Sequence, residues 1–305
     1  MSVRPDSGPA PPNPSMESAL ARIAEGLERL APPQNPAPDW RSTAVAAWQE
    51  DRGFFPLSPG ERIELDDLVG IERQRAQLEN NTQRFLRGMP ANHALMWGAR
   101  GTGKSSLVRA LLHRYLASGL RVIEVDKTQL AQLPQLIELI RRAPFRFVLF
   151  CDDLSFEAGE GNYKHLKSVL DGSLASGGEN HLIYATSNRR HLMPESMQEN
   201  LEAEVRGGEI HAGDTTEEKI SLSDRFGLWL SFHPFSQERY LEAAACWVER
   251  LAARHGGDGR FDAARREAAL LWSRTRGNRS GRTAYQFARD CVGRSLLELA
   301  PPSTE

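Results

Sequence analysis

Gly98-Ala99-Arg100-Gly101-Thr102-Gly103-Lys104-Ser105 is the stretch of sequence that decides the fold. It fits the pattern GxxxxGK[ST], in which glycines let the backbone turn its N–H groups toward the oxygens of a phosphate. The apolar run 93–98 before it predicts a buried strand, and the spacing of apolar residues over 105–119 predicts an amphipathic helix after it. A strand, a glycine-rich loop and a helix in this order predict a phosphate-binding site.

Lys104 and Ser105 have distinct expected roles in this loop. Lys104 would place its charge on the β- and γ-phosphates of a nucleotide, and Ser105 would ligate Mg²⁺. The positive N-terminal end of the helix points at the same anion, so we expect the contacts to extend to Ser106.

A second motif follows in the apolar run Phe147–Cys151, which ends in Asp152 and Asp153. Many strands end at acidic turns, but in a chain that already has the phosphate loop this pattern predicts the other half of a nucleotide site. Asp152 would hold Mg²⁺ through its water shell. Asp153 would polarise the attacking water as a general base.

Short apolar runs alternate with helical segments from Ile63 to about Phe235. This alternation predicts an α/β fold with a five-stranded parallel sheet that helices cover on both faces. The chain turns helical after Pro234, where Ser236 is a good helix cap and three helices are expected. The expected strands occupy 93–98, 121–126, 146–153, 181–188 and 228–235.

The two ends of the chain differ in composition from this core. Nine of the 18 prolines precede Asp39, which is typical of extended, poorly ordered chain. The expected organisation is a Pro-rich, mostly disordered extension with a short amphipathic helix (1–39), an aromatic linker (40–62), a nucleotide-binding core (63–235), a helical lid (236–300) and a tail (301–305).

Composition excludes several classes of protein. The net charge is -2, from 38 basic and 40 acidic residues, which excludes a polycationic nucleic-acid binder but not a local basic patch. Cys151, Cys246 and Cys291 lie far apart without a Cys/His cluster, which argues against a zinc site or a disulfide framework and favours a reduced, cytoplasmic protein. No apolar run is long enough to span a membrane, and none near the N-terminus is typical of a signal peptide.

These motifs together resemble the AAA+ ATPase superfamily, and more narrowly a bacterial AAA+ family described as a domain of unknown function, over about Ile63–Glu298. The resemblance implies a P-loop NTPase core with a C-terminal helical lid. Val69 and Gly70 match the turn that lies near the adenine in AAA+ proteins. Asn188, which ends Thr186-Ser187-Asn188, resembles sensor 1 and would hold the attacking water near the γ-phosphate.

The resemblance also implies roles for two arginines. Arg225, in the segment 222–227, resembles the arginine finger of replication initiators and Holliday-junction motors, which acts in a neighbouring subunit. Arg282, in the segment 280–283, resembles sensor 2 and would reach the γ-phosphate from the same chain, with Arg279 as a competing candidate. The implied cofactors are ATP and Mg²⁺. The implied activity is hydrolysis of ATP to ADP and phosphate by a homo-oligomer, a ring or a filament, that acts on an unknown protein or DNA client.

Departures from the family pattern leave alternatives open. Asp153 stands where most AAA+ enzymes carry Glu, so hydrolysis would be slow unless Glu157 contributes, and a regulatory switch that barely hydrolyses ATP is one alternative. The Arg225 segment favours a second alternative, a helicase-loader-like or initiator-like DNA-binding ATPase. A kinase shares the phosphate loop but leaves Asn188 and the helical lid without a role. The segment 127–132 lacks the aromatic pore loop of protein unfoldases, which argues against a protein translocase.

The sequence allows two interpretations for each of two further segments. The acidic segment 195–218 is either a solvated insertion or a recognition element for a basic partner. The residues 163–167 are either the exposed start of a helix or a DNA contact.

Overall fold

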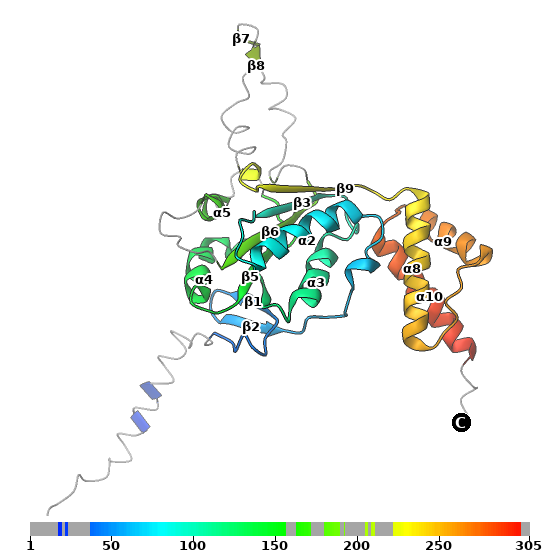
Figure 1. Cartoon of the computed structure of the whole chain (residues 1–305), viewed down its shortest axis with the longest axis horizontal. Helices are drawn as coiled ribbons and strands as arrows, with labels where there is room; N and C mark the ends of the chain where they lie inside the picture. Colours follow the sequence, from blue (N-terminus) through cyan, green and yellow to red (C-terminus); the bar gives the residue numbers. More distant parts are fainter. Residues whose placement is uncertain are drawn as a thin grey trace, which may run out of the picture.

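The structure is a computed structural model that describes residues 37–156, 163–171, 180–189 and 222–299, with the short pieces 18–19, 22–23, 192, 205–206 and 209–210. Most of the expected N-terminal helix and of the acidic segment 195–218 lies outside the described residues, as do Glu157 and the tail. The described part forms an α/β domain beside a domain of three helices (Figure 1).

A seven-stranded sheet forms the centre of the α/β domain, in the order β2-β1-β4-β5-β6-β3-β9. All neighbouring strands are parallel except β1 and β2, so the predicted parallel sheet is confirmed. The five predicted strands correspond to β3, β4, β5, β6 and β9. The bounds are β1 Val45–Gln49, β2 Gly53–Leu57, β3 Ala94–Gly98, β4 Leu120–Glu124, β5 Arg146–Cys151, β6 His181–Ser187 and β9 Leu228–Phe232.

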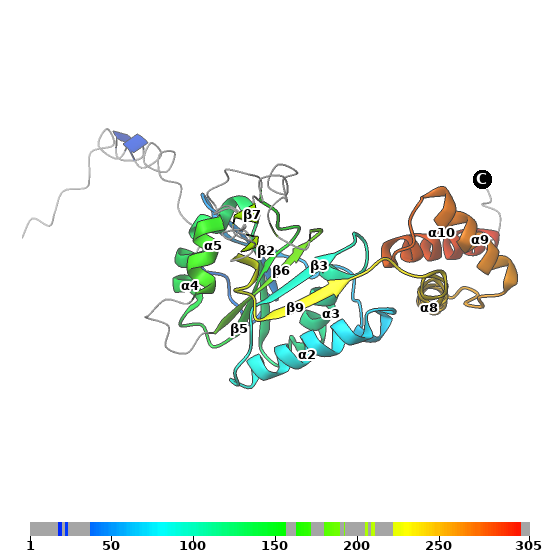
Figure 2. The ribbon, with the colours of Figure 1, turned by 90° about the horizontal axis from the view of Figure 1, so that it is seen from above.

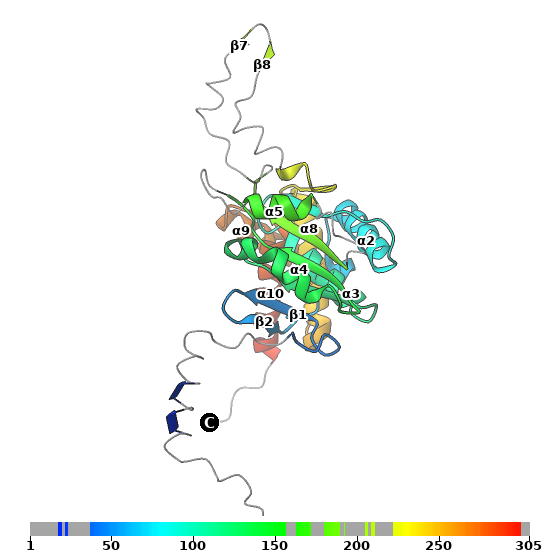
Figure 3. The same cartoon turned by 90° about the vertical axis from the view of Figure 1, so that its left-hand side faces the viewer.

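The predicted count of five strands is wrong, because a hairpin from the expected aromatic linker adds β1 and β2. β1 pairs in parallel with β4, with Val45 opposite Val122, and the hairpin lies at one edge of the sheet (Figure 3). Trp48 and Phe54 are buried against each other, their ring centroids 5.0 Å apart. Pro56 is tolerated in β2 because this is the edge strand. Each strand has only five residues, too few for a clear periodic signal.

Helices cover both faces of the sheet (Figure 2). α2 (Glu72–Leu86) and α3 (Lys104–Tyr115) pack on one face, and α4 (Leu133–Ile140) and α5 (Tyr163–Leu170) pack on the other. Successive residues of a strand point to opposite faces, so Met96 packs in the first layer and Leu95 in the second. The two short 3₁₀ helices are η1 (Leu65–Asp67) and η2 (Lys127–Gln132).

Three helices form the lid: α8 (Gln237–His255), α9 (Ala263–Thr275) and α10 (Gly281–Leu299). Ser236 caps α8 as predicted, because its side chain accepts a hydrogen bond from the Arg239 N–H, and Gly256 ends the helix in the left-handed region. Apolar residues of α8, such as Leu241 and Val248, share one core with Leu65 and Leu68 of the α/β domain. No helix of the described residues has the length and apolar character that crossing a membrane requires.

Candidate functional site

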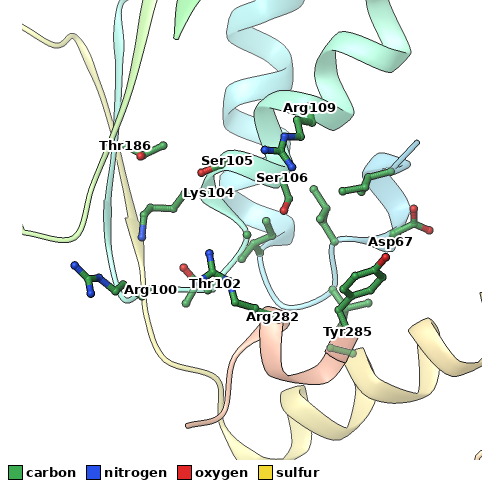
Figure 4. A pocket seen from close by; sticks show the side chains of 18 of the residues that line it. Asp67, Arg100, Thr102, Lys104, Ser105, Ser106, Arg109, Thr186, Arg282 and Tyr285 are labelled. Atoms are coloured by element: carbon green, nitrogen blue, oxygen red, sulfur yellow. The ribbon is translucent and has the colours of Figure 1, made fainter. Parts of the chain in front are cut away.

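A cavity of about 600 Å³ lies between the carboxyl ends of the central strands and the lid (Figure 4). The carboxyl end of an open parallel sheet is where such folds bind ligands. The α/β domain contributes the loop 100–106, the two acids after β5, and Thr186 and Asn188 at the end of β6. The lid contributes residues of α8 and α10.

Glycines give the loop a conformation that other residues would strain. Gly98 and Gly101 have φ values of +122° and +74°. A Cβ on Gly98 would lie 2.1 Å from the Phe232 carbonyl oxygen, and one on Gly101 would lie 2.8 Å from Ser280 Oγ. The loop therefore approaches strand β9 at Gly98 and the lid at Gly101 so closely that neither position has room for a side chain.

The Lys104 ammonium group is buried at the base of the loop, with 7% of the residue exposed. Its Nζ donates hydrogen bonds to the carbonyl oxygens of Gly98 and Ala99, both at 2.8 Å, and to Asn188 Oδ1 at 3.4 Å. Burial lowers the pKa of Lys104, which the nearby carboxylates of Asp152 and Asp153 partly oppose. The loop therefore holds a desolvated cation at the position where phosphate charge is expected.

The two predicted metal ligands lie in direct contact. Ser105 Oγ, in the first turn of α3, donates a 2.7 Å hydrogen bond to Asp152 Oδ1 after β5. Mg²⁺ commonly binds one or two protein side chains together with phosphate oxygens and water, so this pair fits that ion. Among the described residues, no three His, Cys, Asp or Glu side chains gather into a separate metal site.

Asp153 lies beside this pair in an unusual backbone conformation. Its φ of +51° is in the left-handed region, which Asp tolerates better than most residues. Its backbone N–H donates a 2.8 Å hydrogen bond to Thr186 Oγ1, and its carboxylate accepts one from the Asn188 side-chain amide. The structure thus brings the predicted general base and the predicted sensor 1 residue together.

Thr186 holds both acids, although in its segment a role was predicted for Asn188 alone. The Thr186 hydroxyl donates a 2.5 Å hydrogen bond to Asp152 Oδ1 and accepts the N–H of Asp153. Cys151 pairs with Ala185 between the parallel strands β5 and β6, which places the next residues, Asp152 and Thr186, side by side. The role of Thr186 was not predicted because it depends on this register, and the register depends on which strands are neighbours in the sheet.

The lid reaches the phosphate loop through the start of α10. The Arg282 backbone N–H donates a 2.9 Å hydrogen bond to the Gly101 carbonyl oxygen, and the Arg282 side chain lines the cavity with Arg100 (Figure 4). Arg279, the competing candidate, is not a lining residue, and its carbonyl oxygen accepts the Phe235 N–H. Of the two candidates for sensor 2, Arg282 is the one that the structure places in the cavity.

The end of the cavity opposite Lys104, where Tyr285 and Asp67 lie (Figure 4), combines aromatic, apolar and acidic residues. Val69 lines the cavity, as do Trp247 and Tyr285 of the lid, whose rings meet edge to face with centroids 4.8 Å apart. Gly70, the other residue predicted near the adenine, does not line the cavity, and its N–H donates a hydrogen bond to Glu72 Oε1. Apolar and aromatic walls suit a nucleotide base. The remaining apolar lining residues are Ile63, Leu68, Ile71, Phe235 and Ala243.

Acids of the core hold the lid over this end. Glu61 accepts hydrogen bonds from the Arg254 guanidinium and the Tyr285 hydroxyl, and Asp67, 5% exposed, pairs with Arg250. A third ion pair joins Glu72 to Arg239 at 3.0 Å. Burial alone would raise the pKa of Glu72, but its own backbone N–H, the Gly70 N–H and Arg239 lower it. None of these contacts was predicted, because each joins segments that are distant in sequence.

Arg225 does not line the cavity of its own chain. It follows a short helical turn before β9, and its Nε donates a hydrogen bond to Asp171 at the end of α5. A residue expected to act in a neighbouring subunit need not face its own cavity, so this position leaves the predicted role untested. Arg109 of α3, in contrast, lines the cavity without having been predicted.

Comparison with solved structures identifies similar folds. Thermotoga maritima RuvB, a Holliday junction branch migration motor, is 17% identical, with a TM-score of 0.50 over 78% of this chain and 66% of its own. Aeropyrum pernix Orc1, solved in complex with DNA, is 16% identical, with a TM-score of 0.51 over 77% of this chain and 65% of its own. The chain thus spans about two thirds of these structures, and the predicted AAA+ fold is confirmed.

Comparison with protein families and curated proteins gives a narrower result. No curated protein matches the chain significantly in sequence. A family model does match, over residues 41–295, and its description is "Protein of unknown function (DUF815)". This range includes the β1–β2 hairpin, the phosphate loop, both acids and nearly all of the lid. Because the match covers most of the chain, this protein belongs to the DUF815 family.

Proposed function

We propose that this protein binds Mg·ATP in the cavity between core and lid and hydrolyses it to ADP and phosphate. The observation that carries the proposal is the 2.7 Å hydrogen bond between Ser105 and Asp152, which joins the phosphate loop to the acidic strand end. Lys104 lies in the same cavity. A loop that cradles phosphates, a lysine and a paired metal-ligand set are the parts that phosphoryl transfer needs.

Positioning and charge account for most of the catalysis in phosphoryl transfer. Lys104 and the loop N–H groups would bind the β- and γ-phosphates, and Ser105 and Asp152 would hold Mg²⁺. Mg²⁺ held by these two residues would supply positive charge that stabilises the negative charge of the phosphates. Asp153 would accept the proton of the attacking water, and Asn188, which hydrogen-bonds the Asp153 carboxylate, would orient that water.

Arg282 would couple nucleotide binding to the lid. Its side chain lines the cavity from α10 and its backbone N–H is bonded to the loop at Gly101. A γ-phosphate would attract this guanidinium, and loss of the phosphate would weaken the attraction. The lid would therefore hold the core more tightly with ATP than with ADP, which turns the chemical cycle into relative motion of the two domains.

We further propose that the protein works as a homo-oligomer, a ring or a filament, with Arg225 acting on the nucleotide of a neighbouring subunit. It lies outside its own cavity with 22% of its side chain exposed, which supports this role. An arginine supplied in trans accelerates other NTPases about 10³–10⁵-fold. The client is then a protein or a nucleic acid. Salt-dependent binding of single-stranded DNA would support the second, and no binding at low salt would remove it.

A slow regulatory switch is a second candidate function, and the contacts of Asp153 favour it. Its carboxylate is one methylene shorter than glutamate and is already bonded to Asn188. Phosphate release, measured over a wide range of protein concentrations, separates the two functions. Turnover that rises with concentration and is lost in Asp153→Asn, with ATP still bound, supports hydrolysis in an oligomer. Absence of turnover at every concentration supports the switch.

A further inference from the structure

Arg109 is a cation in the cavity wall to which neither motif nor the proposed function gives a role. It is exposed on α3, although its neighbours Val108 and Ala110 are buried. Within the described ranges, its guanidinium forms no ion pair or hydrogen bond with another side chain. An exposed arginine that faces a cavity without an acidic partner is suited to bind an anionic ligand.

The helix geometry directs Arg109 toward the phosphate loop. Arg109 follows Ser106 by three residues, so the two side chains share one face of α3. Side chains of a helix tilt toward its N-terminus, and Figure 4 shows the Arg109 guanidinium directed toward Ser106. At about 1.5 Å per residue, the Arg109 Cα lies about 7.5 Å further along the helix axis than that of Lys104.

This position lies between the two ends of the cavity. Lys104 and Ser105 lie at the end that suits the β- and γ-phosphates, and Tyr285 of the lid lies at the opposite end, which suits the base (Figure 4). A nucleotide that spans the cavity must place its α-phosphate and ribose between them. Ser106 and Arg109 line the wall at that level (Figure 4).

The four acids of the described ranges that share the cavity have partners other than Arg109, and Asp153 accepts a hydrogen bond from the Asn188 side chain. Asp67 pairs with Arg250, and Glu61 pairs with Arg254. Asp152 is bonded to Ser105. The charge of Arg109 is thus available to a ligand and not cancelled at its own position.

We infer that Arg109 binds the α-phosphate of the nucleotide, an inference that rests on the proposed function. Guanidinium groups form charge-assisted, often bidentate hydrogen bonds to phosphate oxygens, which are stronger than those to neutral hydroxyl groups. ATP and ADP both carry an α-phosphate, whereas only ATP carries the γ-phosphate. Arg109 therefore contributes equally to the binding of both nucleotides and retains the nucleotide through the cycle.

The test measures equilibrium binding of the full chain by titration calorimetry with Mg²⁺. Arg109→Ala is expected to weaken the binding of ATP and the binding of ADP by the same factor, about 10-fold or more, because a charged hydrogen bond is lost. The affinity for 2′-deoxy-ATP should fall in this variant by the same factor as the affinity for ATP. Arg109→Lys should recover part of the affinity. Arg87→Ala is the matched control, because Arg87 is exposed at the end of α2 outside the cavity, and it should bind like the original chain.

Three outcomes overturn the inference. The first is an unchanged affinity of Arg109→Ala for both nucleotides, and the second is a loss of affinity for ATP alone. The third is a loss of affinity that is clearly smaller for 2′-deoxy-ATP than for ATP, which would assign Arg109 to the ribose hydroxyl. Thermal unfolding without nucleotide checks the fold of each variant, and if Arg109→Ala is unfolded, Arg109→Lys decides by the same comparison of ATP with ADP. If the original chain binds neither nucleotide, the proposed function fails, whereas equal binding by original and variant chains removes only the role of Arg109.

Discussion

The hydroxyl of Thr186 donates a 2.5 Å hydrogen bond to the carboxylate of Asp152. The same oxygen accepts the backbone N–H of Asp153 at 2.8 Å. One side chain on β6 thus fixes the proposed metal ligand and the proposed general base on β5. Neither acid can shift without breaking a bond to this threonine, so the arrangement of these two proposed groups depends on the pairing of two central strands.

Replacing Thr186 should therefore lower turnover more than binding. Thr186→Val removes both hydrogen bonds but keeps the shape of the side chain. We expect kcat to fall about 10- to 100-fold, as for other groups that orient metal ligands, with ATP affinity changed much less. Thr186→Ser keeps the hydroxyl and should restore most of the activity. Phosphate release and nucleotide titration on the same samples measure the two quantities, and an equal fall in both would contradict this role.

Arg225 offers a test of action between subunits. Arg225→Ala should leave ATP binding intact and lower turnover by about 10³-fold or more, as for arginine fingers of other NTPases. Mixing it with Asp153→Asn protein should restore some activity, because each variant supplies what the other lacks. Asp171→Asn is the matched control, since it breaks the local ion pair and keeps the arginine. Mixtures without any rescue would argue against a role in trans.

The ion pair between Asp67 and Arg250 should stabilise the contact between core and lid. Asp67 is only 5% exposed, so Arg250→Met leaves a buried carboxylate without its cation. We expect the free energy of unfolding to fall by about 3 kcal/mol in chemical denaturation. Adding Asp67→Asn should recover part of this loss. Arg260→Ala, which removes an exposed pair with Asp258, should change stability little. Equal effects of the two arginine variants would contradict a special role for the buried pair.

His93 should make the fold sensitive to acid. Burial lowers its pKa from 6.5 to about 4, with a further contribution from His181, and its Nδ1 accepts the Ile183 N–H. The unfolded chain binds the proton more readily, so this stabilisation is complete above pH 6.5 and is lost as the pH falls to about 4. The loss is at most about 3 kcal/mol.

Denaturation at pH 7 and pH 4.5 measures this effect in the original chain and in His93→Gln. Glutamine keeps an acceptor for the Ile183 N–H but does not titrate, so the variant should lose less stability between the two pH values. If both proteins lose the same stability, His93 is not the group responsible.

Local motifs predicted the centre of the site, because their parts are adjacent in sequence. The loop 98–105 and the pair Asp152 and Asp153 each carry their chemistry within a few residues, and the alternation of strands and helices then implied that they meet at one edge of a parallel sheet. The structure brings Lys104, Ser105 and Asp152 together as expected.

What the sequence did not reveal depends on contacts between distant segments. The pairing of β5 with β6 gives Thr186 its role, and the packing of η1 against α8 gives Asp67 its partner. The β1–β2 hairpin was missed because its stability comes from docking on β4 and from buried aromatic rings such as Trp48. Arg109 carried a weak local signal, its helical spacing from Ser106, which becomes informative only when the cavity is known.

Binding of Mg·ATP is the central claim, and titration calorimetry of the original chain beside Lys104→Ala tests it most directly. Lys104 is the buried cation of the loop, so its loss should abolish tight binding while the circular dichroism spectrum of the variant stays that of a folded protein. The account predicts saturable heat at a stoichiometry of about one nucleotide per chain for the original protein and none for Lys104→Ala. A folded original chain that releases no heat with ATP or ADP in the presence of Mg²⁺, or a Lys104→Ala variant that binds as tightly as the original, would contradict it.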